Sequence, residues 1–405
     1  MRILQINKFF YPKGGSETYY FSLCNLLEKH KHDVVHFSMQ DNKNENSPYK
    51  DYFVSHLNIT KPQVNLSSIG QISRLIWSNE AQKKLEQLLT KEKIDIAHLH
   101  NIDRHLTPSI IPVLKKHKIP VVMTLHDYKI ICPNSLLFAN GEICERCKGR
   151  KFYSPFPQKC IKQSRSISLI GSFEAYYHLW RKVWKKVDLF ISPSQFLKQK
   201  MQEFGVSQEK ITYLPLFLEG KAKKITKSTS KGYFLYFGRL SPEKGVKTLM
   251  EVFSKLPQKT LKIAGSGPQE EELKMIAKDS KNIEFLGFQD KKAIKRLLTG
   301  AKGVIISSIW FENAPYTIME AMWQGKVVLG SRVGGIPELI DDQKSGLLFN
   351  PSNIQDLMSK IEFLEKYPAK LVSFGSEAKK RAEALFNEED HYQRLIQIYQ
   401  KVSST

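Results

Sequence analysis

The sequence lacks any uninterrupted run of about 18 apolar residues, the length that a helix needs to cross the hydrocarbon core of a bilayer. Its first residues, MRILQINKFFYP, also lack the apolar core and small-residue cleavage site of a secretory signal. We therefore expect a cytoplasmic chain without membrane spans. Hydrophobic residues make up 41% and charged residues 25% of the chain, as in ordinary globular proteins, which excludes wholesale disorder.

Acidic residues are scarce relative to basic ones. The chain has 62 Lys and Arg against 40 Asp and Glu, a formal net charge of +22. A surplus of this size predicts an anionic partner: a phosphorylated substrate, an acidic membrane surface or a nucleic acid. The surplus is greatest between residues 146 and 186, where Lys and Arg are frequent and Glu174 is the one acid. This segment is therefore the first candidate for contact with such a partner.

The chain of 405 residues is longer than one hydrophobic core usually supports. Short apolar segments alternate with longer helix-like segments, which is typical of a parallel sheet with crossover helices. The predicted strands are 2–6, 33–37, 94–99, 121–125, 189–191, 233–237, 261–264, 283–286, 303–306 and 327–329. We expect an α/β protein of two doubly wound, Rossmann-like domains, with the ligand in the cleft between them.

A stretch rich in Pro, Lys, Ser and Thr before Tyr233 marks the expected domain junction. We place the first domain at 1–215, with a cysteine-rich insertion at 130–165. A linker at 216–231 leads to the second domain at 232–380. Residues 381–405 are expected to form a C-terminal helix that packs back on the first domain.

Gly14 and Gly15 lie between the first predicted strand and the first predicted helix. Glycines at this point let a phosphate approach the helix N-terminus, where the backbone carries partial positive charge. The loop lacks the G-x-G-x-x-G spacing, which argues against a nicotinamide-binding fingerprint. On the loop alone, substrate contact and an ordinary turn are equally good interpretations.

A second strand end carries cations. Gly238 and Arg239 follow a predicted strand, and Lys244 precedes the next helix. A guanidinium and an ammonium at one strand end suit a diphosphate and would stabilise it as a leaving group without a metal. Downstream, Glu312 lies in a loop and Glu320 in the helix that follows, and carboxylates accept hydrogen bonds from sugar and ribose hydroxyls. Each pattern alone is better interpreted as surface charges.

In combination, these motifs resemble glycosyltransferase family 4 in order and spacing. The resemblance rests on Gly238-Arg239 with Lys244, Ala264-Gly265-Ser266-Gly267-Pro268, Glu312 to Glu320, Gly334-Gly335-Ile336-Pro337-Glu338, the Gly14-Gly15 loop, and Thr124-Leu125-His126-Asp127. It implies a GT-B fold and a retaining transfer from a nucleoside-diphosphate sugar without a catalytic metal. Lys326, where the family usually has proline, and the bulky Trp323 depart from the pattern.

The resemblance assigns the site residues to three roles. The catalytic residues are Arg239, Lys244, Glu312 and His126; the other donor-binding residues are Gly14, Gly15, Gly238, Gly265, Gly267 and Glu320; the acceptor-binding residues are Glu17 and Asp127. In these roles Arg239 and Lys244 hold the diphosphate, and Glu320 holds the ribose. Glu312 contacts the donor sugar, and His126 reaches that sugar across the cleft.

Cysteine is rare, and four of the five cysteines cluster in the insertion. Cys132, Cys144, Cys147 and Cys160 have the spacing C-x11-C-x2-C-x12-C. A cytoplasmic location disfavours disulfides, and four thiolates with an internal C-x2-C predict a structural Zn(II) site with no part in bond breaking. Scattered reduced cysteines are the alternative. Cys24 lies in an apolar helical pattern and is predicted to be core.

Residues 167–187 (ISLIGSFEAYYHLWRKVWKKV) combine aromatic and basic side chains, which suits contact with acidic lipid headgroups, particularly from Trp180 to Lys186. An amphipathic helix buried on one side is an equally good interpretation.

The sequence therefore predicts a retaining hexosyl- or N-acetylhexosaminyltransferase that uses a nucleoside-diphosphate sugar. Its acceptor would be a membrane-associated glycan or lipid at the inner face of an acidic membrane, in cell-envelope polysaccharide assembly. A nucleic-acid-binding protein with a zinc knot is one alternative. It leaves Glu312 and Glu320 unexplained, so we expect no nucleic-acid partner. A sugar-nucleotide epimerase on the same fold is the nearer alternative, and it would form product without an acceptor.

Overall fold

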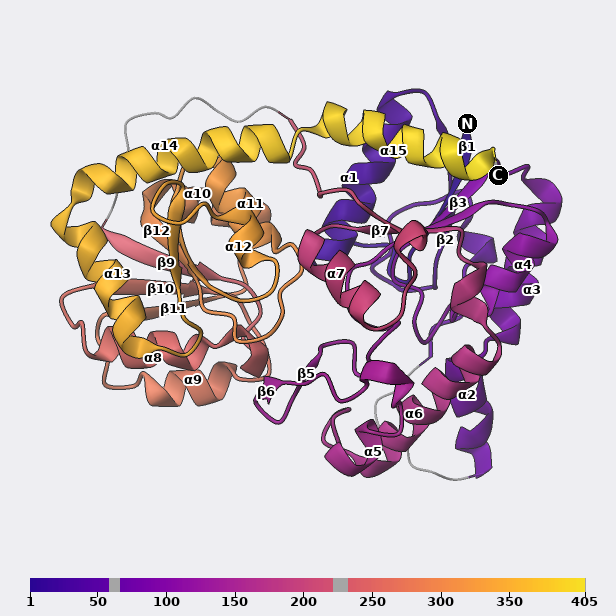
Figure 1. The fold of residues 1–405 in the computed structure, drawn as a ribbon, viewed down its shortest axis with the longest axis horizontal. Coiled ribbons are helices and arrows are strands. Elements are labelled where there is room, and N and C mark those ends of the chain that lie inside the picture. Colours follow the sequence, from indigo (N-terminus) through magenta and orange to yellow (C-terminus); the bar gives the residue numbers. More distant parts are fainter. Residues whose placement is uncertain (58–65, 221–231, 405) are drawn as a thin grey trace. The chain divides into compact units, whose positions relative to one another are not determined.

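The structure is a computed structural model that describes residues 1–57, 66–220 and 232–404 (Figure 1). Most of the predicted linker at 216–231 lies outside the described residues. The chain divides into two compact units. The first comprises Met1–Leu137, Glu145–Leu216 and Glu388–Thr405, and the second comprises Phe138–Cys144 and Phe217–Asn387.

The first unit contains a six-stranded sheet in the order β2-β1-β3-β4-β7-β8, in which every pair is parallel. Its strands are β1 (Arg2–Ile6), β2 (Asp33–Phe37), β3 (Ile96–Leu99), β4 (Val121–Thr124), β7 (Leu189–Ser192) and β8 (Ile211–Tyr213). All residues of β3, β4 and β7 are buried, which is why these segments are apolar runs without alternation. The short strand β8 was not among the predicted strands.

The helices of the first unit are α1 (Gly15–Lys29), α2 (Leu66–Ile76), α3 (Asn79–Lys91), α4 (Ile110–Lys116), α5 (Pro155–Gln158), α6 (Arg165–Trp180), α7 (Gln195–Glu203) and α15 (Glu388–Ser403). The C-terminal helix α15 contacts α1 and β4, so the chain end belongs to this unit (Figure 1). Cys24 on α1 is buried in a cluster with Phe10, Tyr20 and Phe53, as predicted.

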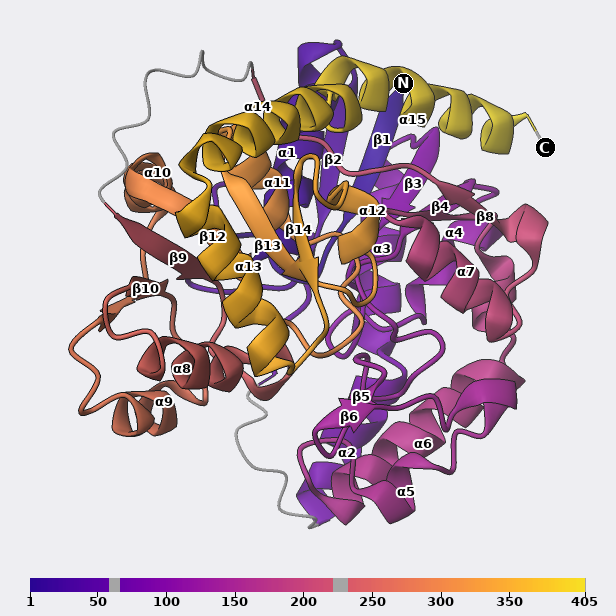
Figure 2. The same cartoon turned by 60° about the vertical axis from the view of Figure 1, so that its left-hand side comes forward.

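The second unit contains a parallel sheet in the order β11-β10-β9-β12-β13-β14. Figure 2 labels β9, β10, β12, β13 and β14 of this sheet. Its strands are β9 (Tyr233–Phe237), β10 (Thr260–Ala264), β11 (Ile283–Gly287), β12 (Ala301–Ile306), β13 (Val327–Ser331) and β14 (Gly346–Phe349). The strand β14 was not predicted. The hairpin β5 (Phe138–Ala139) and β6 (Glu142–Ile143) also belongs to this unit.

The helices of the second unit are α8 (Val246–Ser254), α9 (Glu270–Ile276), α10 (Lys291–Gly300), α11 (Tyr316–Trp323), α12 (Ile336–Leu339), α13 (Ile354–Lys366) and α14 (Pro368–Leu385). Helices α8 and α13 pack on each other, and their apolar side chains form one core cluster with those of β9 and β10. Two doubly wound sheets of six strands confirm the predicted fold class. Within the described residues, no helix has the length and apolarity needed to cross a membrane.

Candidate functional site

The predicted diphosphate-binding residues lie where the strand order of the second sheet reverses. Strand β9 lies between β10 and β12, so the connections leave β9 and β12 toward opposite sides. Ligands of open α/β sheets bind at the carboxyl ends of strands at such a reversal. Gly238 and Arg239 follow β9, while Ser308 and Glu312 follow β12. The topology therefore brings the cationic and acidic motifs to one point of the sheet edge.

Lys244 and Glu312 form an ion pair at this point. The Lys244 Nζ lies 2.6 Å from Glu312 Oε1 and 5.2 Å from the centre of the Trp310 ring. The Ser308 hydroxyl donates to the same carboxylate oxygen at 2.5 Å, and Ser307 donates to the Lys244 carbonyl at 2.9 Å. These contacts fix the ammonium beside the loop that follows β12.

The Glu312 carboxylate is buried but ionised. Burial by itself raises the pKa of Glu312, but the Lys244 charge and hydrogen bonds from Lys244, Ser308 and Trp310 outweigh it and leave the pKa below its usual range. An ionised carboxylate can only accept hydrogen bonds, which suits it to sugar hydroxyls. Glu320 on α11 differs, because burial raises its pKa and only the charge of Lys291 opposes the shift.

Two glycines of the recognised motifs let the loops of this site approach closely. Gly334 has φ +61°, and a Cβ there would overlap the backbone of Glu312, whose carbonyl accepts a hydrogen bond from the Gly335 N–H at 2.7 Å. Gly265 has φ +157°, and a Cβ there would overlap the Gly238 carbonyl. The loops after β9 and β10 therefore lie against each other, with Gly267 in the second of them.

Arg239 is exposed directly after β9, and its backbone carbonyl accepts a hydrogen bond from the Tyr236 hydroxyl at 2.8 Å. In the part of the chain that the structure describes, its guanidinium has no ion-pair partner, in contrast to Lys244. The guanidinium is thus available to an anion at the end of β9.

The predicted residues of the first unit lie at the carboxyl edge of its sheet. His126 and Asp127 follow β4, Asp103 follows β3, and Lys8 follows β1. Lys8 Nζ lies 2.8 Å from Asp103 Oδ1. These side chains come from three neighbouring strands, so the edge carries both charges and hydrogen-bonding groups.

His126 is held by a chain of hydrogen bonds that determines its tautomer. The amide oxygen of Gln5 lies 2.9 Å from His100 Nε2, and His100 Nδ1 lies 3.1 Å from His126 Nε2. Because an amide oxygen only accepts, His100 carries its proton on Nε2 and accepts at Nδ1. His126 then donates from Nε2, which leaves its Nδ1 unprotonated. Burial lowers the pKa of His126 to about 4, so its ring is neutral at pH 7.

The pKa of Asp127 is raised, whereas that of His126 is lowered. Burial, followed by the nearby charge of Asp103, raises the pKa of Asp127 to about 6, although the Lys129 backbone N–H donates to its Oδ1 at 2.8 Å. A carboxyl with this pKa can exchange a proton near neutral pH. Asp127 can therefore change its protonation state near neutral pH.

Gly14 precedes α1, and Gly15 begins it. Glu17 in the first turn is buried, and its Oε1 accepts a hydrogen bond of 3.4 Å from the Asn7 side chain, so the structure places it against the end of β1. Its carboxylate is therefore turned to the sheet edge that carries Lys8.

The zinc site of the four cysteines in the insertion stays a prediction. No three or more His, Cys, Asp or Glu side chains among the described residues are grouped to hold a metal ion. Cys132 instead donates to Asn134 Oδ1 at 2.9 Å, and its hydrogen bond with Cys147 lowers the pKa of Cys132 to about 7. Cys144 and Cys160 are less buried than these two.

The segment 167–187 is not one helix. Helix α6 ends at Trp180, Lys182 has φ +51°, and a separate 3-10 turn covers Val183–Lys186. Trp184 and His178 turn inward, and Arg181 lies 4.6 Å from the centre of the Trp77 ring. The helix of this segment continues only to Trp180, because a left-handed backbone conformation at Lys182 separates it from the turn that follows.

Sequence reasoning missed several residues of both edges: Gln5, Asn7, Lys8, His100, Asp103, Lys129 and Ser308. The sequence contained a signal for most of these residues, because all of them except Gln5 and Lys129 follow within a few positions of the end of a predicted strand. Gln5 lies inside β1, and its role becomes visible only when β1 and β3 are paired.

Two family models cover nearly the whole chain. The model described as Glycosyltransferase Family 4 matches residues 13–218, and the model described as Glycosyl transferases group 1 matches residues 219–381. A Klebsiella pneumoniae protein described as "Uncharacterized 42.6 kDa protein in cps region" is 28% identical over 359 residues, which are 84% of this chain and 87% of that protein. The amylovoran biosynthesis glycosyltransferase AmsK of Erwinia amylovora is 26% identical over 261 residues, 61% of this chain and 64% of AmsK.

Solved structures share the fold at low identity. Sucrose-phosphate synthase from Thermosynechococcus elongatus matches with a TM-score of 0.73 and 16% identity, covering 100% of this chain and 99% of that one. Anabaena HepE in complex with UDP and glucose matches with a TM-score of 0.66 and 19% identity, covering 99% of each chain. These matches confirm the predicted GT-B fold.

Proposed function

This chain belongs to glycosyltransferase family 4, and we propose that it transfers a sugar, with retention of anomeric configuration, from a nucleoside-diphosphate sugar to a membrane-linked glycan or lipid. The observation that carries the proposal is the Lys244–Glu312 pair at the strand-order reversal of the second sheet. The ammonium can bind the diphosphate of such a donor, and the ionised carboxylate beside it can accept hydrogen bonds from the hydroxyls of the sugar ring.

In this proposal, Arg239 and Lys244 bind the diphosphate, and their charges stabilise it as the bond to the anomeric carbon breaks. Glu312 accepts hydrogen bonds from the donor sugar, and Glu320 accepts them from the ribose. The acceptor hydroxyl attacks the anomeric carbon on the face that the diphosphate leaves, and its proton departs with the diphosphate or to solvent. The first unit binds the acceptor at the sheet edge that carries His126 and Asp127.

The polysaccharide setting is supported by one relative described as a protein in a cps region and by another named for amylovoran biosynthesis. Contact with an acidic membrane is supported by one face of α6. Leu169, Phe173, Tyr176 and Trp180 recur at helical spacing and are exposed, Trp180 to 71%. Exposed Lys and Arg lie on the same segment of the chain, as in helices that lie at a lipid interface.

The test is turnover by the Lys244→Ala variant. Thermal stabilisation by UDP, GDP, ADP and their sugars first identifies the donor. With that donor and a lipid-linked saccharide acceptor, we expect Lys244→Ala to lower turnover by roughly a hundredfold or more, since it removes a positioned charge. Lys247→Gln is the matched control, because this exposed lysine pairs with Glu272 on the neighbouring helix and should leave turnover unchanged.

Equal turnover of folded Lys244→Ala and wild type would contradict the assignment of the site. Product formed from the sugar nucleotide without any acceptor would favour the epimerase alternative.

A further inference from the structure

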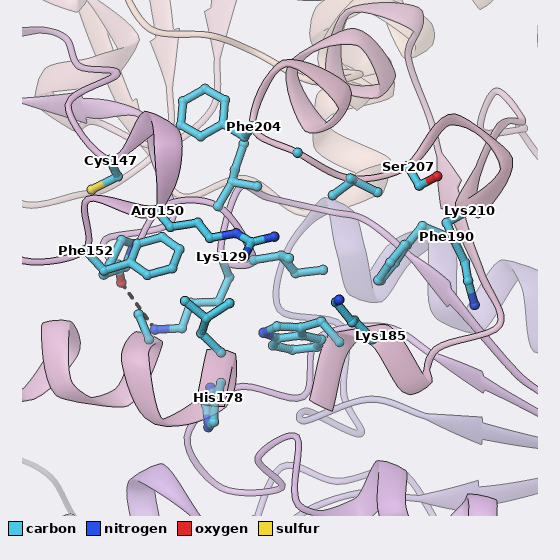
Figure 3. Close-up of a pocket in the computed structure, with 18 of the residues that line it drawn as sticks. Lys129, Cys147, Arg150, Phe152, His178, Lys185, Phe190, Phe204, Ser207 and Lys210 are labelled. Atoms are coloured by element: carbon cyan, nitrogen blue, oxygen red, sulfur yellow. Dashed lines mark hydrogen bonds between the residues drawn. The ribbon is translucent and has the colours of Figure 1, made fainter. Parts of the chain in front are cut away.

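The first unit contains a cavity of about 480 Å³ that none of the assigned catalytic, donor-binding or acceptor-binding residues lines (Figure 3). Its walls come from the start and the middle of the insertion, the inner side of α6, the 3-10 turn Val183–Lys186, strand β7 and the loop that joins α7 to β8. All of these segments belong to one compact unit. The cavity is therefore a feature of that unit by itself.

The body of the cavity is apolar. Ile131, Phe152, Leu179, Phe190 and Phe204 line it. A cavity of this composition favours a hydrocarbon group over a sugar or a nucleotide, because burying hydroxyls without partners is costly.

The polar groups of the cavity are mainly cationic. Four Lys and Arg side chains and two carboxylates line it, and one of the carboxylates, Glu174, is bound by Lys129 at 2.8 Å. Arg150 and Lys185 have no carboxylate partner among the residues that the structure describes. Figure 3 shows the Arg150 side chain extending into the middle of the lining residues, with Lys185 and Lys210 to the right of it. These cations would complement an anionic group at one end of an apolar chain.

Two further observations connect the cavity to its surroundings. A smaller cavity of about 20 Å³ shares Lys129, Ile130, Glu174 and Trp184 with it and is also lined by His126 and Asp127. Helix α6 lines the large cavity with Ala175 and Leu179, while its exposed apolar stripe lies on the opposite face. The cavity thus lies between the predicted acceptor edge and the surface proposed to meet the membrane.

We propose that this cavity binds the hydrocarbon chain of a lipid phosphate or diphosphate acceptor, with the phosphate at Arg150 and Lys185 and the saccharide directed toward Asp127. This inference rests on the proposed function and specifies the acceptor of that reaction. A lipid phosphate is favoured over a free phosphate because the apolar residues form most of the lining. It is favoured over an uncharged lipid because Arg150 and Lys185, which have no carboxylate partner among the described residues, can bind a phosphate.

The test measures binding of farnesyl phosphate to the full chain by isothermal titration calorimetry, with inorganic phosphate and farnesol as separate probes. Ala175→Trp would fill the cavity, and Arg150→Gln with Lys185→Gln would remove its free cations. We expect each of these variants to weaken farnesyl phosphate binding at least tenfold, and wild type to bind the other two probes more weakly. Lys186→Gln is the matched control, because this exposed lysine adjoins Lys185 but does not line the cavity.

Unchanged binding in Ala175→Trp would overturn the proposal, and so would equal binding of inorganic phosphate or of farnesol. The double cation variant keeps the test decisive if Ala175→Trp does not fold, which circular dichroism would reveal. Stabilisation by the donor nucleotide is measured on every variant and should not change. A chain that binds farnesyl phosphate as expected but transfers no sugar would contradict the proposed function and leave the lipid site supported.

Discussion

Asp103 and Asp127 have pKa values moved in opposite directions by one shared environment. Burial would raise the pKa of Asp103, but Lys8 at 2.8 Å and further cations outweigh it and lower the pKa. The Asp103 charge in turn adds to burial in raising the pKa of Asp127 to about 6. One carboxylate is thus permanently ionised and the other changes its charge near neutral pH, which is a common arrangement at functional sites.

We predict that Asp127→Asn makes the protein more stable relative to wild type as pH rises. The folded pKa of about 6 lies above the ordinary value of 3.8, so the folded state binds more protons between these values. Wild type therefore loses stability from about pH 4 to pH 6 through this group, and the Asn variant does not. At 1.36 kcal/mol per pKa unit and with allowance for partial solvation, the difference should grow by about 1 to 3 kcal/mol.

Urea denaturation at pH 4.5 and pH 7.5 measures this difference. Asp279→Asn changes an exposed carboxylate and serves as the control. Parallel pH profiles for wild type and Asp127→Asn would show that Asp127 is not perturbed.

Lys326 departs from the family pattern, and its side chain makes hydrogen bonds between helix α10 and strand β12. The family usually has proline at this position, yet the lysine is buried here and donates to the carbonyl oxygens of Thr299 at 2.8 Å and Ala301 at 3.0 Å. These carbonyls belong to the end of α10 and the start of β12, where helix carbonyls lack partners within the helix. A cation there also interacts favourably with the helix dipole. Lys326 thus caps the C-terminal end of α10 and connects this helix to strand β12.

We predict that Lys326→Met destabilises the second unit by about 1 to 2 kcal/mol, because two charge-assisted hydrogen bonds are lost while the aliphatic stem remains. Hydrogen exchange of the last α10 amides should accelerate, and the urea midpoint should fall. Lys344→Met removes an exposed lysine and is the control. If the α10 amides of Lys326→Met exchange as in wild type, the lysine does not cap this helix.

At the scale of the whole molecule, the net charge of +22 and the exposed apolar face of α6 both favour contact with an acidic membrane. In the proposed membrane contact, positive charge would attract the chain to an acidic bilayer, and the aromatic side chains would supply an apolar anchor. Neither factor alone distinguishes a membrane from another anionic partner, because exposed aromatic side chains can also stack on nucleic-acid bases.

We predict that replacing Phe173 and Trp180 by Ser reduces flotation of the protein with phosphatidylglycerol vesicles roughly tenfold, since most of the exposed aromatic area is removed. Raising the salt concentration should weaken wild-type flotation through screening. Phe288→Ser, which removes an exposed aromatic of the second unit, is the control and should float as wild type does. Flotation that is absent in wild type, or equal in all three proteins, would count against membrane contact.

The sequence by itself determined the alternation of strands and helices, the ten predicted strands, and the positions of Arg239, Lys244, Glu312 and His126 next to strand ends. These features depend on the hydrophobic periodicity of neighbouring residues and on short motifs, and both can be recognised from the sequence alone. Local patterns did not determine where the helix within 167–187 ends, because a left-handed backbone conformation at Lys182 separates α6 from the 3-10 turn Val183–Lys186.

Only the tertiary structure decided which distant residues meet. Lys244 pairs with Glu312, and Gln5 orients His126 through His100, because strand order places segments remote in sequence at one sheet edge. The apolar cavity beside α6 likewise required packing of several segments, none of which has a distinctive pattern. Ion pairs, tautomers and cavities depend on distances between side chains, and a linear sequence contains those distances only through the fold.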